Sequence, residues 1–242
     1  MIELRRQGGR LLRIGHRGAA ALAPENSLRS LELAVELGVD LVEFDVLDLP
    51  DGTLALAHSQ RERHYAADVP TLDEALGFFA QTATGTGLQL DLKPRGREGA
   101  LVEALRRHGL VERSFVSSFD ARALRTLAAL EPRLRLGFTY PWDRFGLAVR
   151  RPLAPLVAGT LLGLRRALPR RIAGLLRRAR ASVAVLHWAV VSRAAVARCH
   201  ADEVPVLAWT VNDAKLVTRL DELGVDGVIT DDPRVFGATL AP

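Results

Sequence analysis

Short apolar runs alternate with amphipathic stretches along the whole chain. Residues with helical periodicity predict helices over 27–37, from 71 onward, and over 100–108, 121–130, 193–200 and 214–223. The apolar runs are rich in Val, Leu and Ile, as buried strands are, and cover 11–15, 41–47, 88–92, 115–118, 136–140, 183–186, 206–210 and 227–230. Such alternation predicts parallel strands joined by helical crossovers.

Eight strands within 242 residues predict an α/β fold, a (β/α)8 TIM barrel, with an open doubly wound sheet as the alternative. No Gly-x-Gly-x-x-Gly follows the first strand, and polar clusters end several different strands, which favours the barrel. No repeat or low-complexity linker is present, so we expect one domain over 1–242. The stretch 142–180 is too long for a barrel loop and predicts an excursion of short helices, broken at Pro152, Pro155 and Pro169.

Composition narrows the class of protein. The single cysteine, Cys199, supports neither an internal disulfide nor a thiolate metal site. The N-terminus does not resemble a signal peptide, and the longest apolar stretches are too short to span a membrane. We therefore expect a cytoplasmic protein, with a peripheral position at the inner membrane surface as the alternative. The net charge is +5, but aromatic residues make up 5% and do not interleave with basic ones, which argues against nucleic acid as a partner.

Ionisable side chains gather where strands end. In a barrel the carboxyl ends of all the strands meet at one rim, so these side chains are expected to converge. Lys93 is one of only two lysines among 33 basic residues, which suggests that its position requires a compact ammonium. The candidates are His16, Arg17, Glu43, Asp45, His58, Asp91 and Lys93.

Glu43 and Asp45 are two residues apart on one predicted strand, so both side chains point to the same face, from backbone positions about 6–7 Å apart. Two carboxylates in a partly dry cleft repel each other and need a cation or a shared proton. With Asp91 from the next barrel strand they form an oxygen-only site, which suits one divalent cation, Mg²⁺ or Ca²⁺. The alternative is that these carboxylates face solvent or pair with arginines.

His16 and His58 each follow a strand and could form an acid/base pair. Phosphodiester hydrolysis needs one group to take a proton from the nucleophile and another to protonate the leaving oxygen. Arg17 and Lys93 would then bind and polarise the phosphate. A histidine at such a position is also commonly a hydrogen-bonded structural residue.

Two further positions have both a functional and a structural interpretation. Glu25 could hydrogen-bond Arg17 or His16 and orient it, while the adjacent Asn26 is a plausible helix cap. Trp209 ends a late strand, where it could line a polyol or apolar site or simply fill the top of the barrel.

These residues resemble the ordered motifs of the glycerophosphodiester phosphodiesterase family. The resemblance runs in order from Ile14 to Pro233 and implies a TIM barrel that uses a divalent cation to hydrolyse glycerophosphodiesters to sn-glycerol 3-phosphate and an alcohol. It assigns the metal to Glu43, Asp45 and Asp91, and acid/base work to His16 and His58. The motifs that carry it are His16-Arg17-Gly18, Pro24-Glu25-Asn26-Ser27, Glu43-Phe44-Asp45, Asp51-Gly52 before His58, Asp91-Leu92-Lys93, Trp209-Thr210-Val211-Asn212 and residues 224–233.

The chain departs from the family pattern in three places, one of which, Ser27 where the family has threonine, keeps the hydroxyl. The family usually has His-Asp where this chain has His58-Ser59, so an expected partner of the second histidine is missing. It usually has Glu-x-Lys where this chain has Asp91-Leu92-Lys93, one methylene shorter. A shorter ligand can shift an ion by about one ångström or recruit a water.

The stretch 144–180 contains ten arginines and no acidic residue. Apolar residues at helical spacing between the arginines suggest a basic amphipathic segment that contacts an anionic membrane or lipid substrate; a lid or subunit contact is the alternative.

Two alternatives to glycerophosphodiester hydrolysis stay open. One is phospholipase D-like action on lysophospholipid or sphingolipid head groups, and the other is a non-catalytic barrel that binds phosphodiesters or membranes.

Overall fold

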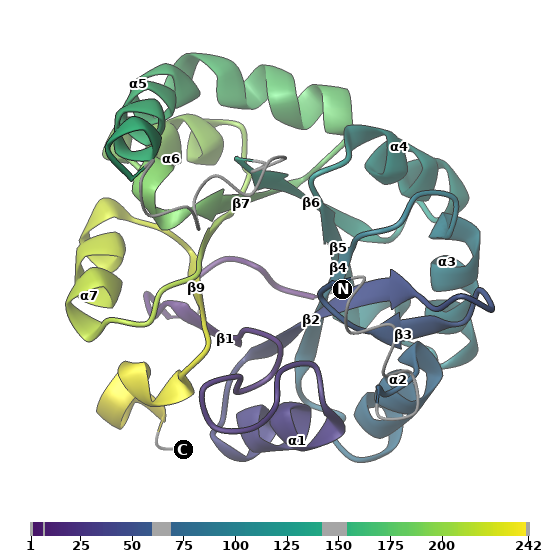
Figure 1. Ribbon diagram of the computed structural model, residues 1–242. Coiled ribbons are helices and arrows are strands. Elements are labelled where there is room, and N and C mark those ends of the chain that lie inside the picture. Colours follow the sequence, from purple (N-terminus) through teal and green to yellow (C-terminus); the bar gives the residue numbers. More distant parts are fainter. Residues whose placement is uncertain (1, 7, 60–68, 142–153, 241–242) are drawn as a thin grey trace.

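The computed structural model describes residues 2–6, 8–59, 69–141 and 154–240. Within them, eight parallel strands close into a barrel, because β1 pairs with both β2 and β9 (Figure 1). The predicted (β/α)8 barrel is confirmed, and the open sheet is excluded. The barrel strands are β1 (Leu12–Gly15), β2 (Leu41–Asp48), β4 (Gly87–Leu92), β5 (Ser114–Ser118), β6 (Arg135–Tyr140), β7 (Val183–His187), β8 (Val206–Trp209) and β9 (Gly227–Thr230).

A ninth strand, β3 (Leu54–Leu56), lies antiparallel to the end of β2 and adds a hairpin to the barrel rim. The turn between them is at Asp51-Gly52, where Gly52 has a φ of 90° and Asp51 Oδ1 accepts from the Thr53 N–H at 2.9 Å. This hairpin carries the chain to His58.

Helices surround the strands (Figure 1). A capping box begins α2: the Thr71 hydroxyl accepts from Glu74 N, and Glu74 accepts from Thr71 N. The cap of α1 is Ser27, not Asn26 as predicted, because Asn26 has a φ of 59° and uses its side chain elsewhere. The helices are α1 (Leu28–Glu36), α2 (Leu72–Gln81), α3 (Glu98–Arg107), α4 (Ala121–Leu130), α5 (Ala154–Ala179), α6 (Arg193–Ala201) and α7 (Ala214–Leu223), with short 3-10 turns η2 (Val111–Arg113), η5 (Trp188–Val190) and η6 (Pro233–Leu240).

The arginine-rich stretch differs from its prediction. From Ala154 onward it is one 26-residue helix, α5, with Pro169 inside it, so the expected break into short helices is wrong for this part. Leu168, Ile172, Leu176 and Ala179 are buried at helical spacing. This half of α5 is therefore the barrel helix between β6 and β7, whereas residues 142–153 lie outside the described residues. No described helix is long and apolar enough to cross a membrane.

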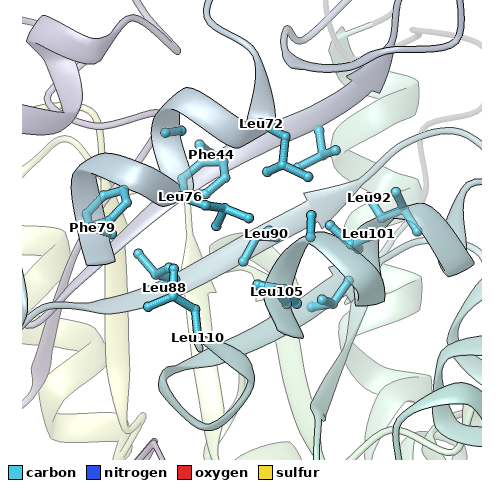
Figure 2. Packing of buried hydrophobic residues seen from close by; sticks show 14 of the residues in the cluster. Phe44, Leu72, Leu76, Phe79, Leu88, Leu90, Leu92, Leu101, Leu105 and Leu110 are labelled. Atoms are coloured by element: carbon cyan, nitrogen blue, oxygen red, sulfur yellow. The ribbon is translucent and has the colours of Figure 1, made fainter. Parts of the chain in front are cut away.

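Apolar side chains fill two separate layers. One lies between strands and helices, where residues of β2 and β4 pack against α2 and α3 (Figure 2). The other closes the bottom of the barrel, where Leu12, Ile14, Phe115, Leu207 and Ile229 pack together. Because this plug is apolar, the inward-facing polar residues that follow along each strand lie above it, toward the rim.

We predict that Leu76→Ala lowers the free energy of unfolding by about 3 kcal/mol, because Leu76 is fully buried between α2 and the strands and its truncation leaves a cavity. Leu130→Ala is the matched control, since Leu130 is 42% exposed at the end of α4, and it should cost well under about 1 kcal/mol. Urea unfolding measures both; equal losses would contradict the core described here.

Candidate active site

A cavity of about 770 Å³ opens at the carboxyl ends of the barrel strands. Of the nine site residues predicted from the sequence, it is lined by all except Glu25. Glu25 is exposed, and its Oε2 pairs with Arg17 Nη1 at 2.6 Å, which is one of the two partners predicted for it. The structure therefore brings the predicted residues together, and their roles stay predictions.

Glu43, Asp45 and Asp91 form a buried acidic cluster, with one oxygen from each lying within 4.8 Å of the others. The register of β2 and β4 brings these carboxylates together. Asp45 on β2 is directly beside Asp91 on β4, and Glu43 precedes Asp45 by two residues, so it faces the barrel interior one step below Asp45. Asn26 holds Asp45 twice, donating from Nδ2 to Oδ2 at 3.1 Å and accepting from the Asp45 backbone N–H at 3.0 Å.

Two cations face this cluster. Lys93 Nζ lies 2.7 Å from Asp45 Oδ1 and also contacts Asp91, and Arg17 Nε lies 3.0 Å from Asp45 Oδ2. Burial alone would raise the pKa of Asp45, but Lys93, His58 and Arg17 hold it below its usual range. Burial would likewise lower the pKa of Lys93, and the carboxylates of Asp91 and Asp45 instead raise it.

Glu43 is the carboxylate that these cations do not balance. Burial raises its pKa to about 7, and nearby Asp45 and Asp91 act in the same direction, while His16 and Lys93 oppose them. Three carboxylates thus face two cations, which leaves the cluster with an excess of negative charge. Three hard oxygen donors and this excess negative charge fit a divalent cation such as Mg²⁺ or Ca²⁺.

His16 lies on the β1 side of the cluster. Its Nδ1 is 2.5 Å from Asp231 Oδ1, and its Nε2 is 3.9 Å from Glu43 Oε2. Burial lowers the pKa of His16, but Glu43 and Asp231 outweigh it and the net shift is upward. Asn212 holds Asp231 in turn, donating from Nδ2 at 2.5 Å and accepting from the Asp231 N–H at 2.9 Å.

Asp231 and Asn212 belong to motifs of the sequence, but the sequence pattern connects neither of them with His16. The register of β1 and β9 brings Asp231 to His16: Gly15 lies beside Thr230, so the residues that follow, His16 and Asp231, emerge side by side. The sequence alone does not give that register. Ser117 was missed entirely, although its hydroxyl donates to Asp91 Oδ1 at 2.7 Å.

His58 lies on the other side of the cluster and is more exposed. Its Nδ1 is 3.1 Å from Asp45 Oδ2, and its Nε2 is 3.4 Å from Arg17 Nη2. A carboxylate partner for this histidine is therefore supplied by β2, although the family's usual aspartate is replaced by Ser59.

The opposite wall of the cavity is apolar and aromatic. Trp209 ends β8 half-buried and meets Phe119 edge to face, with ring centroids 6.0 Å apart. Its indole N–H donates to the Val185 carbonyl at 3.3 Å, which fixes the ring. Val185 and Ile229, on the neighbouring strands β7 and β9, also line this side. The cavity thus combines a charged half with a half that suits an apolar or weakly polar group.

A tight turn positions the first cluster of site residues. Arg17 has a φ of 50°, an uncommon conformation for a side chain of this size, and its N–H donates to Glu43 Oε2 at 2.9 Å. Gly18 follows with a φ of 82°, and a Cβ there would lie 2.3 Å from Ser30 Oγ and 2.4 Å from the Ser30 carbonyl carbon. The turn is thus pressed against α1 and aims Arg17 into the site.

Comparison with known protein families identifies the Glycerophosphoryl diester phosphodiesterase family, whose model matches residues 16–73 and 60–235. A glycerophosphodiester phosphodiesterase of Caldanaerobacter subterraneus subsp. tengcongensis is 25% identical over 262 residues, covering 92% of this chain and 95% of that protein.

Two solved structures are similar to this chain over nearly its whole length. An Oleispira antarctica phosphodiesterase in complex with the product sn-glycerol-3-phosphate has a TM-score of 0.72 and 26% identity, covering 94% of this chain and 96% of that one. A glycerophosphodiester phosphodiesterase from Parabacteroides distasonis has a TM-score of 0.73 and 23% identity, covering 94% and 95%. The second supports the barrel fold.

We predict that Gly18→Ala destabilises the protein more than Gly96→Ala. Both glycines have positive φ, 82° and 77°, so the backbone cost of a Cβ is shared. Only Gly18 also has Ser30 in the way, whereas nothing lies within 4 Å of a Cβ at Gly96. The difference in free energy of unfolding should be about 1–3 kcal/mol, measured by urea denaturation. Indistinguishable values would mean that the turn is not packed against α1.

Proposed function

Because the chain belongs to the glycerophosphoryl diester phosphodiesterase family, we propose that it hydrolyses glycerophosphodiesters to sn-glycerol 3-phosphate and an alcohol in the cavity at the barrel rim. The family resemblance seen in the sequence is confirmed, and the predicted enzyme class with it. The observation that carries the proposal is the buried cluster of Glu43, Asp45 and Asp91 with a histidine on each side. The sn-glycerol-3-phosphate in the Oleispira antarctica structure supports the choice of product.

The acidic cluster is the proposed metal site. Glu43, Asp45 and Asp91 would hold one divalent cation, Mg²⁺ or Ca²⁺, because one oxygen of each lies within 4.8 Å of the others and Lys93 and Arg17 offset only part of their charge. When bound, such a cation polarises a phosphate oxygen and lowers the pKa of an attacking hydroxyl. Ser117 and Asn26 keep Asp91 and Asp45 in place through the hydrogen bonds described above.

Arg17 and Lys93 are the proposed phosphate ligands. Both line the cavity, and Glu25 fixes the Arg17 guanidinium from behind at 2.6 Å, which leaves Nη2 directed toward His58. A guanidinium and an ammonium on the phosphate stabilise the charge that grows on its oxygens as the P–O bond breaks.

His16 and His58 are the proposed proton-transfer groups. With Nδ1 of His16 donating to Asp231, only Nε2 faces the cavity and can exchange a proton with a reacting oxygen. Nδ1 of His58 bonds Asp45 in the same way, so its Nε2 faces Arg17 and the phosphate bound there. One imidazole takes the proton of the nucleophile, and the other protonates the leaving oxygen.

Lysophospholipids are a second candidate substrate class. The apolar half of the cavity, with Trp209 and Phe119, can accommodate more hydrocarbon than a small alcohol leaving group provides. A non-catalytic barrel is less well supported, because three buried carboxylates without a function would only reduce stability.

We predict that hydrolysis of glycerophosphocholine requires a divalent cation. A chelator should abolish turnover, added Mg²⁺ or Ca²⁺ should restore it, and Asp45→Asn should lower cation affinity by at least about tenfold, because it removes a ligand from the cluster. Phosphorus NMR identifies the product, and calorimetry measures cation binding without reference to activity.

Asp48→Asn is the matched control: Asp48 lies on the same strand but outside the cluster, near Arg97, so cation affinity should not change. Full activity in the presence of chelator would contradict the metal site. Cation binding with no turnover on glycerophosphodiesters or lysolipids would favour the non-catalytic barrel.

We also predict that Asp231→Asn lowers kcat about 10–100-fold and leaves KM nearly unchanged. Asp231 is a positioning residue: its carboxylate keeps the proton on Nδ1 of His16 and fixes the ring, but it does not reach the phosphate site. Steady-state kinetics separate the two parameters.

Asp232→Asn is the matched control, because the neighbouring carboxylate pairs with Arg234 instead of His16 and its loss should leave kcat unchanged. A rise in KM with an unaltered kcat would show that Asp231 acts on binding and not through the histidine.

A further inference from the structure

A strip of the outer surface carries only positive charge. Between residues 144 and 201 the chain has no Asp or Glu. Within the described part of this segment, α5 contributes Arg165, Arg166, Arg170, Arg171, Arg177 and Arg178, and no ion pair to any of them is found among the described residues. Like charges this close repel one another, so an anionic partner would be stabilised here.

The charges have an orderly arrangement on α5. Arg166, Arg170 and Arg177 are spaced four and seven residues apart, so they project from nearly the same side of the helix. The buried side carries Leu168, Ile172 and Leu176. At 100° per residue the three arginines lie roughly opposite that buried side, and all three are exposed. Figure 1 shows α5 at the outer edge of the barrel, beside α6.

The same surface exposes apolar side chains. Among the described residues, three large hydrophobic side chains are classed as exposed, and two of them are here: Leu162 on α5 at 46% and Trp188 in η5 at 38%. The two elements pack together, and Arg165 Nη1 donates to the Ala189 carbonyl at 3.5 Å. Arginines beside exposed Leu and Trp are typical of surfaces that sit at a lipid headgroup layer.

Trp188 is linked to the active-site cavity by two ring contacts, one tilted and one edge to face. Its centroid lies 5.4 Å from that of His187, which lies 5.2 Å from that of Trp209, a residue of the cavity wall. The exposed Trp188 therefore contacts, through His187, the residue that forms the apolar wall of the cavity.

We propose that α5 and η5 form a docking surface for an anionic phospholipid bilayer, with Arg166, Arg170 and Arg177 on the headgroups and Leu162 and Trp188 inserted beside them. The consequence for catalysis rests on the proposed function, because docking would bring the cavity to lysophospholipid held in the membrane. Polyanions such as DNA could meet the charge, but they offer no hydrocarbon for the two exposed apolar side chains.

The test is co-sedimentation of the full chain with vesicles of phosphatidylcholine, with and without phosphatidylglycerol. The wild type should bind the anionic vesicles only, and binding should weaken as salt is raised. The triple variant Arg166→Gln, Arg170→Gln, Arg177→Gln should lower the binding constant roughly a hundredfold. Trp188→Ala should weaken binding severalfold without changing its salt dependence.

The matched control removes the same charge elsewhere, through Arg5→Gln, Arg29→Gln and Arg107→Gln, three exposed residues of the N-terminal segment, α1 and α3. It should bind as the wild type does. An equal loss of vesicle binding in both triple variants would show that only the net charge matters, and it would overturn the proposal. Binding of the wild type to DNA but not to vesicles would also overturn it.

Hydrolysis of soluble glycerophosphocholine separates this proposal from the proposed function. The α5 triple variant should hydrolyse it at the wild-type rate and lose activity only on lysophospholipid in anionic vesicles. If the wild type binds vesicles but hydrolyses neither substrate, the docking surface stands and the proposed function fails. If the wild type hydrolyses glycerophosphocholine but does not bind anionic vesicles, the proposed function stands and the docking surface is wrong.

Discussion

The site depends on one electrostatic constraint: three carboxylates are buried within 4.8 Å of one another and must be balanced. Lys93 and Arg17 balance part of that charge, and the pKa of Glu43, raised to about 7, marks the remainder. Much of the surrounding polar structure serves to keep this arrangement in place. The side chain of Asn26 binds Asp45, and Ser27 caps the helix instead. In the turn before Gly18, Arg17 has a positive φ, and this conformation directs its side chain into the site.

Barrel closure supplies what a single strand cannot. β1 and β9 are the first and last strands, and their pairing places His16 next to Asp231, 215 residues away along the chain. The apolar plug below keeps the floor of the barrel closed, so the polar side chains can gather only at the rim. A fold with an open edge between these strands would leave His16 without its carboxylate partner.

The strands, the barrel and the gathering of the predicted residues could be read from the sequence, because each depends on local patterns: apolar runs, i, i+2 spacing as in Glu43 and Asp45, and polar residues at strand ends. Features that depend on register or on competition between partners could not. Asp231 needed the β1–β9 register, and Asn26 matches a cap signal but is drawn away by Asp45. Pro169 reads as a helix breaker, yet burial of Leu168 and Ile172 on the barrel outweighs the lost hydrogen bond.

The two sides of α5 are under different constraints: one packs on the barrel and the other faces outward. Packing on the barrel fixes only the side that carries Ile172 and Leu176, and places no requirement on the opposite side. A helix that merely covered a barrel would normally mix acidic and basic residues there, because paired charges raise solubility without accumulating repulsion. The outward side of α5 instead has arginine without any acidic residue, and nothing in the packing requires that choice. The charge therefore calls for an explanation outside the fold, and the exposed Trp188 linked through His187 to the cavity wall relates that explanation to the substrate.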